Sequence, residues 1–383
     1  MPENPSERCT RIGDAGDPRT RVEKDALTNI AHDRLHNQRL SSAGFSTPGE
    51  VVSWLGAVQA QEYQDAKWAL ALRMRRATDA AIERAFASGT ILRTHVMRPT
   101  WHFVAPADIR WMLALTAPRV QAAIAYYDRQ LGLDAAVFKR SNKALADALR
   151  GGAQLTRQEL RTVLQRTGVA ADGVQRLAHL IMRAELGGVV CSGARRGKQF
   201  TYTLLDERVP QTRVLPRDEA LAALTRRYFT SHGPAQVKDF VWWSGLTTAD
   251  ARAGLEMVQK HHLTEDVIDG KTYWRSSSMR AITRESRVAY LLPLYDEYLI
   301  AYKDRSAALD PARWTQRPPN HDPFSSPIVV DGWFVGGWKR TLKKGAVVIT
   351  LTPFAPLNRT DARAVADAAH RYGAFLGLDV MFA

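Results

Sequence analysis

The fold is decided by residues 156–204, which read TRQELRTVLQRTGVAADGVQRLAHLIMRAELGGVVCSGARRGKQFTYTL. Thr156 and Glu159 form a capping box, the pattern that marks the start of a helix. Apolar Leu160 and Leu164 follow at helical spacing. The stretch therefore predicts a helix that begins directly after Thr156.

The rest of this stretch adds a second helix and a hairpin. The helix covers roughly residues 173–185, and two glycines at 187–188 end it. A strand at 189–191 is expected to pair with one at 200–204 across a polar turn with a basic tip. Helices followed by a β-hairpin are the outline of a winged helix, which is a helix-turn-helix with a wing.

The same order of elements occurs earlier in the chain. Thr47 and Glu50 form another capping box. The expected elements are helices over 48–58 and 78–87, strands over 91–96 and 101–104, a turn at 97–100, and a further helix from residue 105.

A third copy follows the second. Asp269-Gly270 between two alternating runs is a strong signal for a hairpin. The expected elements are helices over 218–230, 236–243 and 247–261, and strands over 263–268 and 272–274.

The chain changes character after about residue 285. Short strands over 288–294, 328–330, 333–335 and 346–351, with a helix over 360–372, predict a small β-barrel or sheet. We therefore expect an α+β fold of three tandem winged helices and a C-terminal β-barrel. The expected parts are a disordered tail (1–24), winged helices at 25–150, 151–213 and 214–284, and the barrel region at 285–383.

The composition favours an anionic partner. The 383 residues include 53 Lys and Arg against 39 Asp and Glu, for a net charge of +14 and a pI near 10.0. Such a balance suits nucleic acid or a membrane surface. The two cysteines cannot build a disulfide framework, and no apolar run approaches the ~18 residues of a membrane span. We expect a cytoplasmic protein without a membrane segment or secretory signal.

Common catalytic motifs are missing from the sequence. It holds no CxxC pair, no HExxH and no GxSxG, and the run at 269–272 lacks the glycine of a phosphate loop because residue 265 is Glu. His261 and His262 point about 100° apart on a helix, so joint metal binding is not expected. We expect neither a metal nor a cofactor.

Two neighbouring carboxylates, Asp296 and Glu297, allow two interpretations. One could stabilise a cationic transition state, or they could pair with Lys303 or Arg305. The sequence favours the pairing.

The run Gln59-Ala60-Gln61 ends an amphipathic stretch. Residues i and i+2 diverge by about 200° on a helix, so both amides can meet one ligand only if the helix ends near Val58. The loss of apolar periodicity after Gln61 allows such a break. Solvated glutamines at a helix end are the alternative.

These residues carry a resemblance to a known family. Residues 59–61 and 93–104, and the later segments 292–305 and 327–332, resemble the YcaQ/AlkZ winged-helix DNA glycosylases over nearly the whole chain beyond the tail. The resemblance implies three tandem winged helices and a C-terminal β-barrel in a C-shaped scaffold around DNA. It also implies excision of N7-alkylated purines, with interstrand cross-links from alkylating natural products as possible substrates, in repair or in antibiotic self-resistance.

The family motif is Gln-apolar-Gln in the AlkZ-like branch and Gln-apolar-Asp in the other. Gln59 and Gln61 match the former, so the resemblance makes them the catalytic pair. An N7-alkylated purine leaves as a neutral base, and the enzyme must mainly place a water against C1′. Two amides offer the donors and acceptors for that task. No lysine is evident for a Schiff base, so we expect a monofunctional hydrolase that leaves an abasic site.

The expected partner is double-stranded DNA with alkylated purines, held in an open cleft because cross-linked bases are hard to flip. Tandem modules make a monomer sufficient. A DNA-binding regulator without chemistry stays as the alternative, and a scaffold for protein partners is a third. Candidate DNA contacts are Arg98, His102, Arg195, Arg196 and Lys198.

Overall fold

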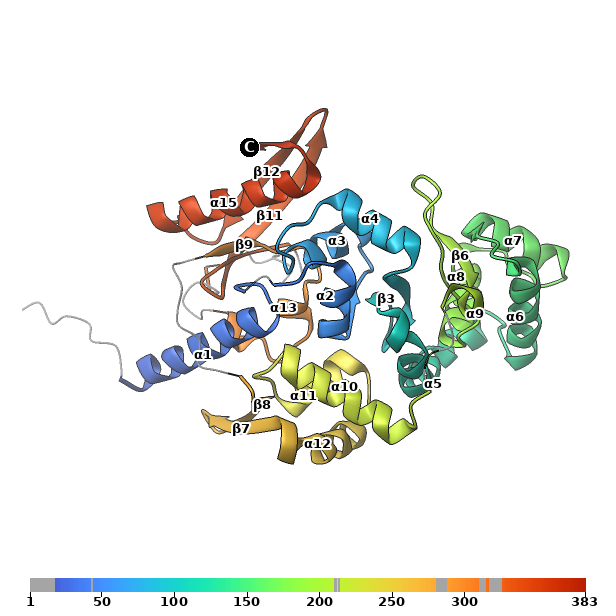
Figure 1. The fold of residues 1–383 in the computed structure, drawn as a ribbon, viewed down its shortest axis with the longest axis horizontal. Coiled ribbons are helices and arrows are strands. Elements are labelled where there is room, and N and C mark those ends of the chain that lie inside the picture. The colour runs from blue at the N-terminus through green and yellow to red at the C-terminus, as the bar shows by residue number, and fades with distance from the viewer. Residues whose placement is uncertain are drawn as a thin grey trace, which may run out of the picture.

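The structure is a computed structural model that combines helices and sheets in an α+β fold. Figure 1 shows three groups of helices and short strands, here called the first (48–104), second (135–204) and third (217–276) groups, beside a C-terminal sheet. The structure describes residues 18–42, 44–209, 212, 214–279, 288–309, 315–316 and 326–383.

The described chain begins with helix α1 (Pro18–Asn37). The predicted tail over 1–24 is therefore wrong for residues 18–24, while residues 1–17 lie outside the described residues. The end of α1 is fixed against the third group, since Arg34 Nε donates to the Pro234 carbonyl (2.9 Å) and Asn37 Nδ2 to that of Gly233 (2.8 Å). These contacts span about half the chain and leave no local signal in the sequence.

The second group contains the elements that the sequence predicts. The Thr156–Glu159 capping box is present in both directions and starts α7, and β5 pairs with β6 in the wing. A short strand β4 adds to the hairpin, so the sheet order is β4-β6-β5. The elements are α6 (Ala135–Leu149), β4 (Leu155–Thr156), α7 (Arg157–Arg166), α8 (Val174–Leu186), β5 (Val190–Ser192) and β6 (Thr201–Leu204).

The first group repeats this order but differs from the prediction: it contains helix α3 and strand β1, which were not predicted, and its first helix is shorter. The first helix ends at Leu55 rather than near Val58, because Gly56 (φ 88°) caps it and the chain then becomes a strand. The sheet order is β1-β3-β2. The elements are α2 (Pro48–Leu55), β1 (Ala57–Gln59), α3 (Tyr63–Ala71), α4 (Asp79–Ser88), β2 (Leu92–Val96) and β3 (Arg98–Val104).

The third group has the same order with a single bridge, Ala235 to Trp274, in place of its first strand. Asp269 (φ 50°) and Gly270 (φ 68°) form the predicted two-residue turn, where both residues need positive φ. The elements are α10 (Arg217–Ser231), α11 (Val237–Ser244), α12 (Thr248–His262), β7 (Leu263–Ile268) and β8 (Lys271–Ser276).

Two helices connect the groups. The long α5 (Pro106–Gln130) leads from the first group to the second, and the short α9 (Leu205–Arg208) follows the second. The second group has a core of its own, whereas the first group shares its core with the C-terminal sheet. The first group and the sheet therefore act as one packed unit.

The C-terminal sheet has five strands in the order β13-β12-β11-β10-β9. The predicted barrel does not close, because β9 and β13 stay at opposite edges; helix α15 covers the sheet, and Tyr372 packs between Trp338 (5.1 Å) and Trp68 of α3 (5.0 Å). The elements are β9 (Ala289–Leu291), α13 (Glu297–Ile300), η1 (Ser306–Ala308), β10 (Pro327–Val330), β11 (Trp333–Lys343), β12 (Ala346–Pro353), α15 (Arg359–Leu376) and β13 (Asp379–Phe382).

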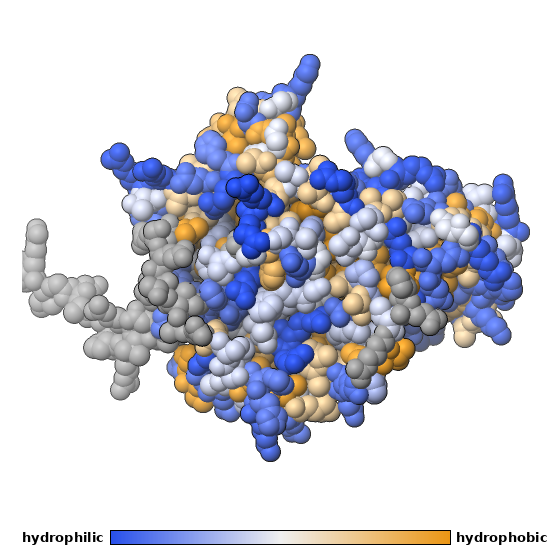
Figure 2. All heavy atoms as spheres, in the orientation of Figure 1, coloured by the Kyte–Doolittle hydropathy of each residue, from blue (hydrophilic) through white to orange (hydrophobic). Residues whose placement is uncertain are grey.

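The surface is rich in charge. Figure 2 shows hydrophilic residues predominating over the second group on the right of this face. Among the helices of the described residues, none combines the length and apolar character needed to cross a membrane.

Candidate functional site

Gln59 lies at the end of β1, opposite His102 of β3. Its backbone N–H donates to Glu297 Oε1 (3.0 Å), and its side-chain Oε1 accepts from Arg98 Nη2 (2.9 Å). The residue is 8% exposed. Gln59 is therefore fixed by a carboxylate on its backbone and a guanidinium on its side chain, while its Nε2 makes no hydrogen bond with the described residues.

The extended backbone continues past Gln59. The Ala60 N–H donates to the Trp101 carbonyl (2.7 Å), and the Ala60 carbonyl accepts from Arg93 Nε (2.9 Å). The strand ends at Gln59, and the half-buried Gln61 follows two residues later, at the bend before α3.

The sequence requires the helix to end near Val58 if both amides are to meet one ligand. In the structure the helix ends earlier, at Leu55, and Ala57–Gln59 is a strand, so helical geometry does not force the two amides apart. The Gln61 side chain makes no hydrogen bond with any described residue, so its amide is available to a ligand. The alternative of a solvated helix end does not fit this backbone.

Glu297 holds the Gln59 backbone in place. It is fully buried and also accepts from Trp243 Nε1 (2.9 Å), and His232 Nε2 lies 3.4 Å from its Oε2. Burial raises the pKa of Glu297, but His232, the Arg98 charge and the Gln59 N–H outweigh it and hold the pKa below its ordinary value. The carboxylate is therefore ionised at neutral pH.

Arg98 connects the amide to the third group. Besides Gln59, it donates from Nη1 to the Trp243 carbonyl (3.1 Å). The preceding Met97 has φ 63°, and a Cβ on Gly245 would lie 2.2 Å from the Met97 carbonyl oxygen. Only glycine permits this approach, which sets the place of Arg98.

His102 is fully buried behind Arg98. Burial, with the Arg98 charge, lowers the pKa of His102 to about 3. The ring is neutral: its Nδ1 donates to the Thr100 carbonyl (2.9 Å), which leaves Nε2 to accept from Arg98 Nη2 (3.1 Å). His102 can therefore hold Arg98 in place, and the DNA contact expected of it stays a prediction.

Asp296 and Glu297 do not have the partners that the sequence suggested. Asp296 forms a bidentate ion pair with Arg73 (both 2.9 Å), in place of Lys303 or Arg305. Glu297 accepts a hydrogen bond from the Gln59 backbone N–H, 238 residues earlier in the chain. Sequence reasoning had noticed these carboxylates, but nothing local could assign such remote partners, and it missed Trp243 and His232 entirely.

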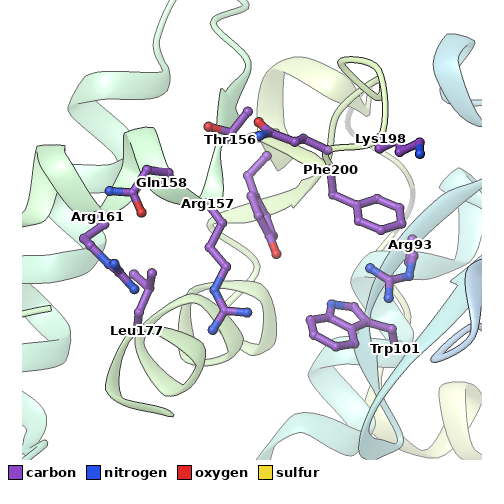
Figure 3. Close-up of a pocket in the computed structure, with 11 residues that line it drawn as sticks. Arg93, Trp101, Thr156, Arg157, Gln158, Arg161, Leu177, Lys198 and Phe200 are labelled. Atoms are coloured by element: carbon purple, nitrogen blue, oxygen red, sulfur yellow. The ribbon is translucent and has the colours of Figure 1, made fainter. Parts of the chain in front are cut away.

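The three basic residues of the wing have different surroundings. Arg195 folds back onto Tyr63, with Glu83 3.5 Å away. Arg196 is exposed and pairs with Glu159 (2.8 Å). Lys198 lies at the rim of a cavity of about 450 Å³ between the first and second groups, and its side chain runs away from the centre (Figure 3). The structure thus does not bring the three together into one basic patch.

Metal ligands do not gather in the described part of the chain. No group of three or more His, Cys, Asp or Glu residues there has the arrangement of a metal site. The groups that meet at Gln59 are its own amide, the Glu297 carboxylate and the Arg98 guanidinium.

Comparisons with known proteins agree with this architecture. A family model described as "DNA glycosylase AlkZ-like" matches residues 52–375. The chain is 26% identical over 360 residues to an interstrand DNA cross-link repair glycosylase of Streptomyces sahachiroi, covering 88% of this chain and 93% of that protein.

A solved structure has the same fold. The DNA glycosylase AlkZ of Streptomyces sahachiroi superposes with a TM-score of 0.77 at 24% identity, over 93% of this chain and 99% of that chain. Since the family model spans most of the sequence, this chain belongs to the AlkZ-like DNA glycosylase family.

Proposed function

We propose that this protein hydrolyses the N-glycosidic bond of N7-alkylated purines in double-stranded DNA. The observation that carries the proposal is the pair of amides at the end of strand β1, with Gln59 held by Arg98 and Glu297 and with Gln61 making no hydrogen bond to the described residues. The relative from Streptomyces sahachiroi is named for repair of interstrand cross-links, and we include such lesions among the substrates.

The two amides have different roles in this proposal. Arg98 occupies one lone pair of Gln59 Oε1, so Gln59 presents its Nε2 donors to the oxygen of a water. Gln61, with a free carbonyl, accepts a hydrogen bond from the same water. The water is thereby oriented toward C1′ as positive charge develops there. Its oxygen becomes the sugar hydroxyl, its proton leaves to solvent, and the base departs neutral.

The scaffold in this proposal consists of three winged helices. In the first and second groups, a short strand follows the first helix and pairs with the last strand of the hairpin, and the Ala235 bridge repeats this in the third. We propose these groups as the winged helices of the predicted regions 25–150, 151–213 and 214–284. The net charge of +14 supports binding of a DNA backbone.

The test uses a duplex with one N7-methylguanine. We expect strand breaks only after alkali, because a monofunctional enzyme leaves an intact abasic strand, and no protein–DNA adduct after borohydride. Breaks without alkali, or a trapped adduct, would contradict the monofunctional mechanism. Retention of one particular sequence with no excision would favour a DNA-binding regulator.

The acceptor role of Gln61 has a test of its own. We expect Gln61→Asp to retain more excision than Gln61→Ala, because a carboxylate still accepts a hydrogen bond from the water. The control is Gln64→Ala, which removes an exposed glutamine three residues away. Equal losses in the Asp and Ala variants would argue against the acceptor role.

A further inference from the structure

The cavity between the first and second groups has the features of an anion site. None of its eleven lining residues is acidic. Figure 3 shows Arg157 and Arg161 on one wall and Arg93, Trp101 and Phe200 on the other. The volume of about 450 Å³ is that of a small-ligand pocket.

Arg93 is built to present the edge of its guanidinium. Its two faces are covered by Trp101 (4.3 Å) and Phe200 (4.4 Å), and its Nε is used by the Ala60 carbonyl. The side chain is 6% exposed, and its two Nη atoms make no hydrogen bond with the described residues. A stacked guanidinium with a free edge matches the oxygens of a phosphate.

Further donors belong to residues that line the cavity. The N-terminus of α7 begins at Arg157 in the cavity wall, and helix N-termini favour anions. Arg161 Nε and Trp101 Nε1 are buried without a hydrogen-bond partner. Buried donors without partners are rare unless a ligand completes them.

Two acidic groups near the cavity have partners elsewhere. Glu159 binds Thr156 and Arg196, and Glu185, whose charge acts on Arg93, is hydrogen bonded to His95 (2.5 Å). The exposed Glu62 also acts on Arg93. None of these three carboxylates lines the cavity, so the charged side chains in its lining are all basic.

We propose that this cavity binds a backbone phosphodiester of the damaged strand. Both hydrogen bonds of the Ala60 backbone go to residues of the cavity wall, Trp101 and Arg93. A phosphate bound there is tied through Ala60 to the Gln59–Gln61 pair, and so fixes the register of the lesion. This inference rests on the proposed function for the identity of the strand, and on the cavity alone for the phosphate.

The experiment replaces phosphates near the lesion one at a time with a neutral methylphosphonate. Affinity for each duplex is measured by fluorescence anisotropy with the wild type, Arg161→Gln and Arg157→Gln. We expect one position where the methylphosphonate weakens wild-type binding by on the order of tenfold and adds no further loss in either variant. The slope of log Kd against log salt concentration should fall by about 1 in each variant.

Arg166→Gln is the matched control, because it removes the same charge from the exposed end of the same helix. It should keep the full methylphosphonate effect. The proposal would be overturned if, at every position, the loss of affinity from the methylphosphonate and the loss from the Arg→Gln substitution simply added. So would unchanged DNA affinity when millimolar inorganic phosphate saturates the cavity, because the site would then serve a free anion.

The outcome separates the two proposals. A coupled position is one where the methylphosphonate weakens binding of the wild type but not of the variants. Because binding needs no catalysis, a coupled position in a protein that excises no base would support the phosphate site and contradict the proposed glycosylase activity. Normal excision without any coupled position would reject the phosphate site alone. In the variants we expect a raised KM with kcat unchanged, since the cavity positions the strand and touches no reacting atom.

Discussion

At the scale of single residues, the site depends on buried polar groups that fix one another. Glu297 binds the Gln59 backbone, Arg98 binds the Gln59 side chain, and neutral His102 accepts from Arg98. Removal of any one of these groups leaves its neighbour without a hydrogen-bond partner. A buried donor or acceptor without a partner destabilises the folded state by about 1–3 kcal/mol. The arrangement therefore holds Gln59 in one position before any substrate arrives.

Acid should weaken this arrangement through His102. Its pKa of about 3 in the folded protein lies below the ordinary value of 6.5, so between these pH values the unfolded chain takes up a proton that the folded chain refuses. Stability is highest above pH 6.5 and falls as pH drops toward 3. We expect His102→Gln to reduce the slope of unfolding free energy against pH by roughly 1.4 kcal/mol per unit. Denaturant unfolding at a series of pH values measures it, and an unchanged slope would contradict it.

At the scale of elements, the decisive feature is the change from helix α2 to strand β1 at Gly56. Because the helix has ended before Gln59, the two amides are not held on diverging sides of a helix. The third group then fixes β3 through the close approach of Gly245 to Met97. Elements from three parts of the chain thus meet at Gln59.

The approach of Gly245 to Met97 predicts the effect of one methyl group. In Gly245→Ala the new Cβ meets the Met97 carbonyl at 2.2 Å, so Met97 and Arg98 must shift. We expect lower stability and a loss of excision per folded molecule. Gly270→Ala is the control: its φ of 68° is close to the 70° of Gly245, but nothing lies within 4 Å of its Cβ. Melting temperature and excision rate separate the two; equal excision would contradict this role.

The elements also show what the sequence could predict. The starts of the helices after the capping boxes at Thr47 and Thr156 were predicted correctly, since capping is local. Helices α1, α3 and α6 were missed. Strand β1 was missed because a three-residue strand is defined by its partner β3 and not by its own periodicity. The partners of Glu297 were missed for the same reason: they come from remote parts of the chain.

At the scale of the whole molecule, the positive net charge and the arrangement of the groups both support the proposed function. A basic chain arranges three similar groups around the Gln59 site, and the cavity beside it adds a place for a phosphate. The first group shares its core with the C-terminal sheet, so the motif rests on a large packed unit. The second group carries one wall of the cavity on a separate core.

The net charge of +14 predicts strongly salt-dependent DNA binding. We expect log Kd to rise linearly with log salt concentration, with damaged and undamaged duplexes giving similar slopes, since the backbone supplies this term. Anisotropy titrations over a range of salt concentrations measure the slope. Binding that does not respond to salt would contradict a backbone-driven encounter.

The most direct test of the central claim is a double-mutant cycle on Gln59 and Gln61. Base release from an N7-methylguanine duplex is measured under single-turnover conditions for Gln59→Ala, Gln61→Ala, the double variant and the control Gln64→Ala. If both amides hold one water, each single variant loses on the order of 100-fold, the double variant loses little more, and the control stays at the wild-type rate. Fully additive losses, or base release that survives without both glutamines, would contradict the account.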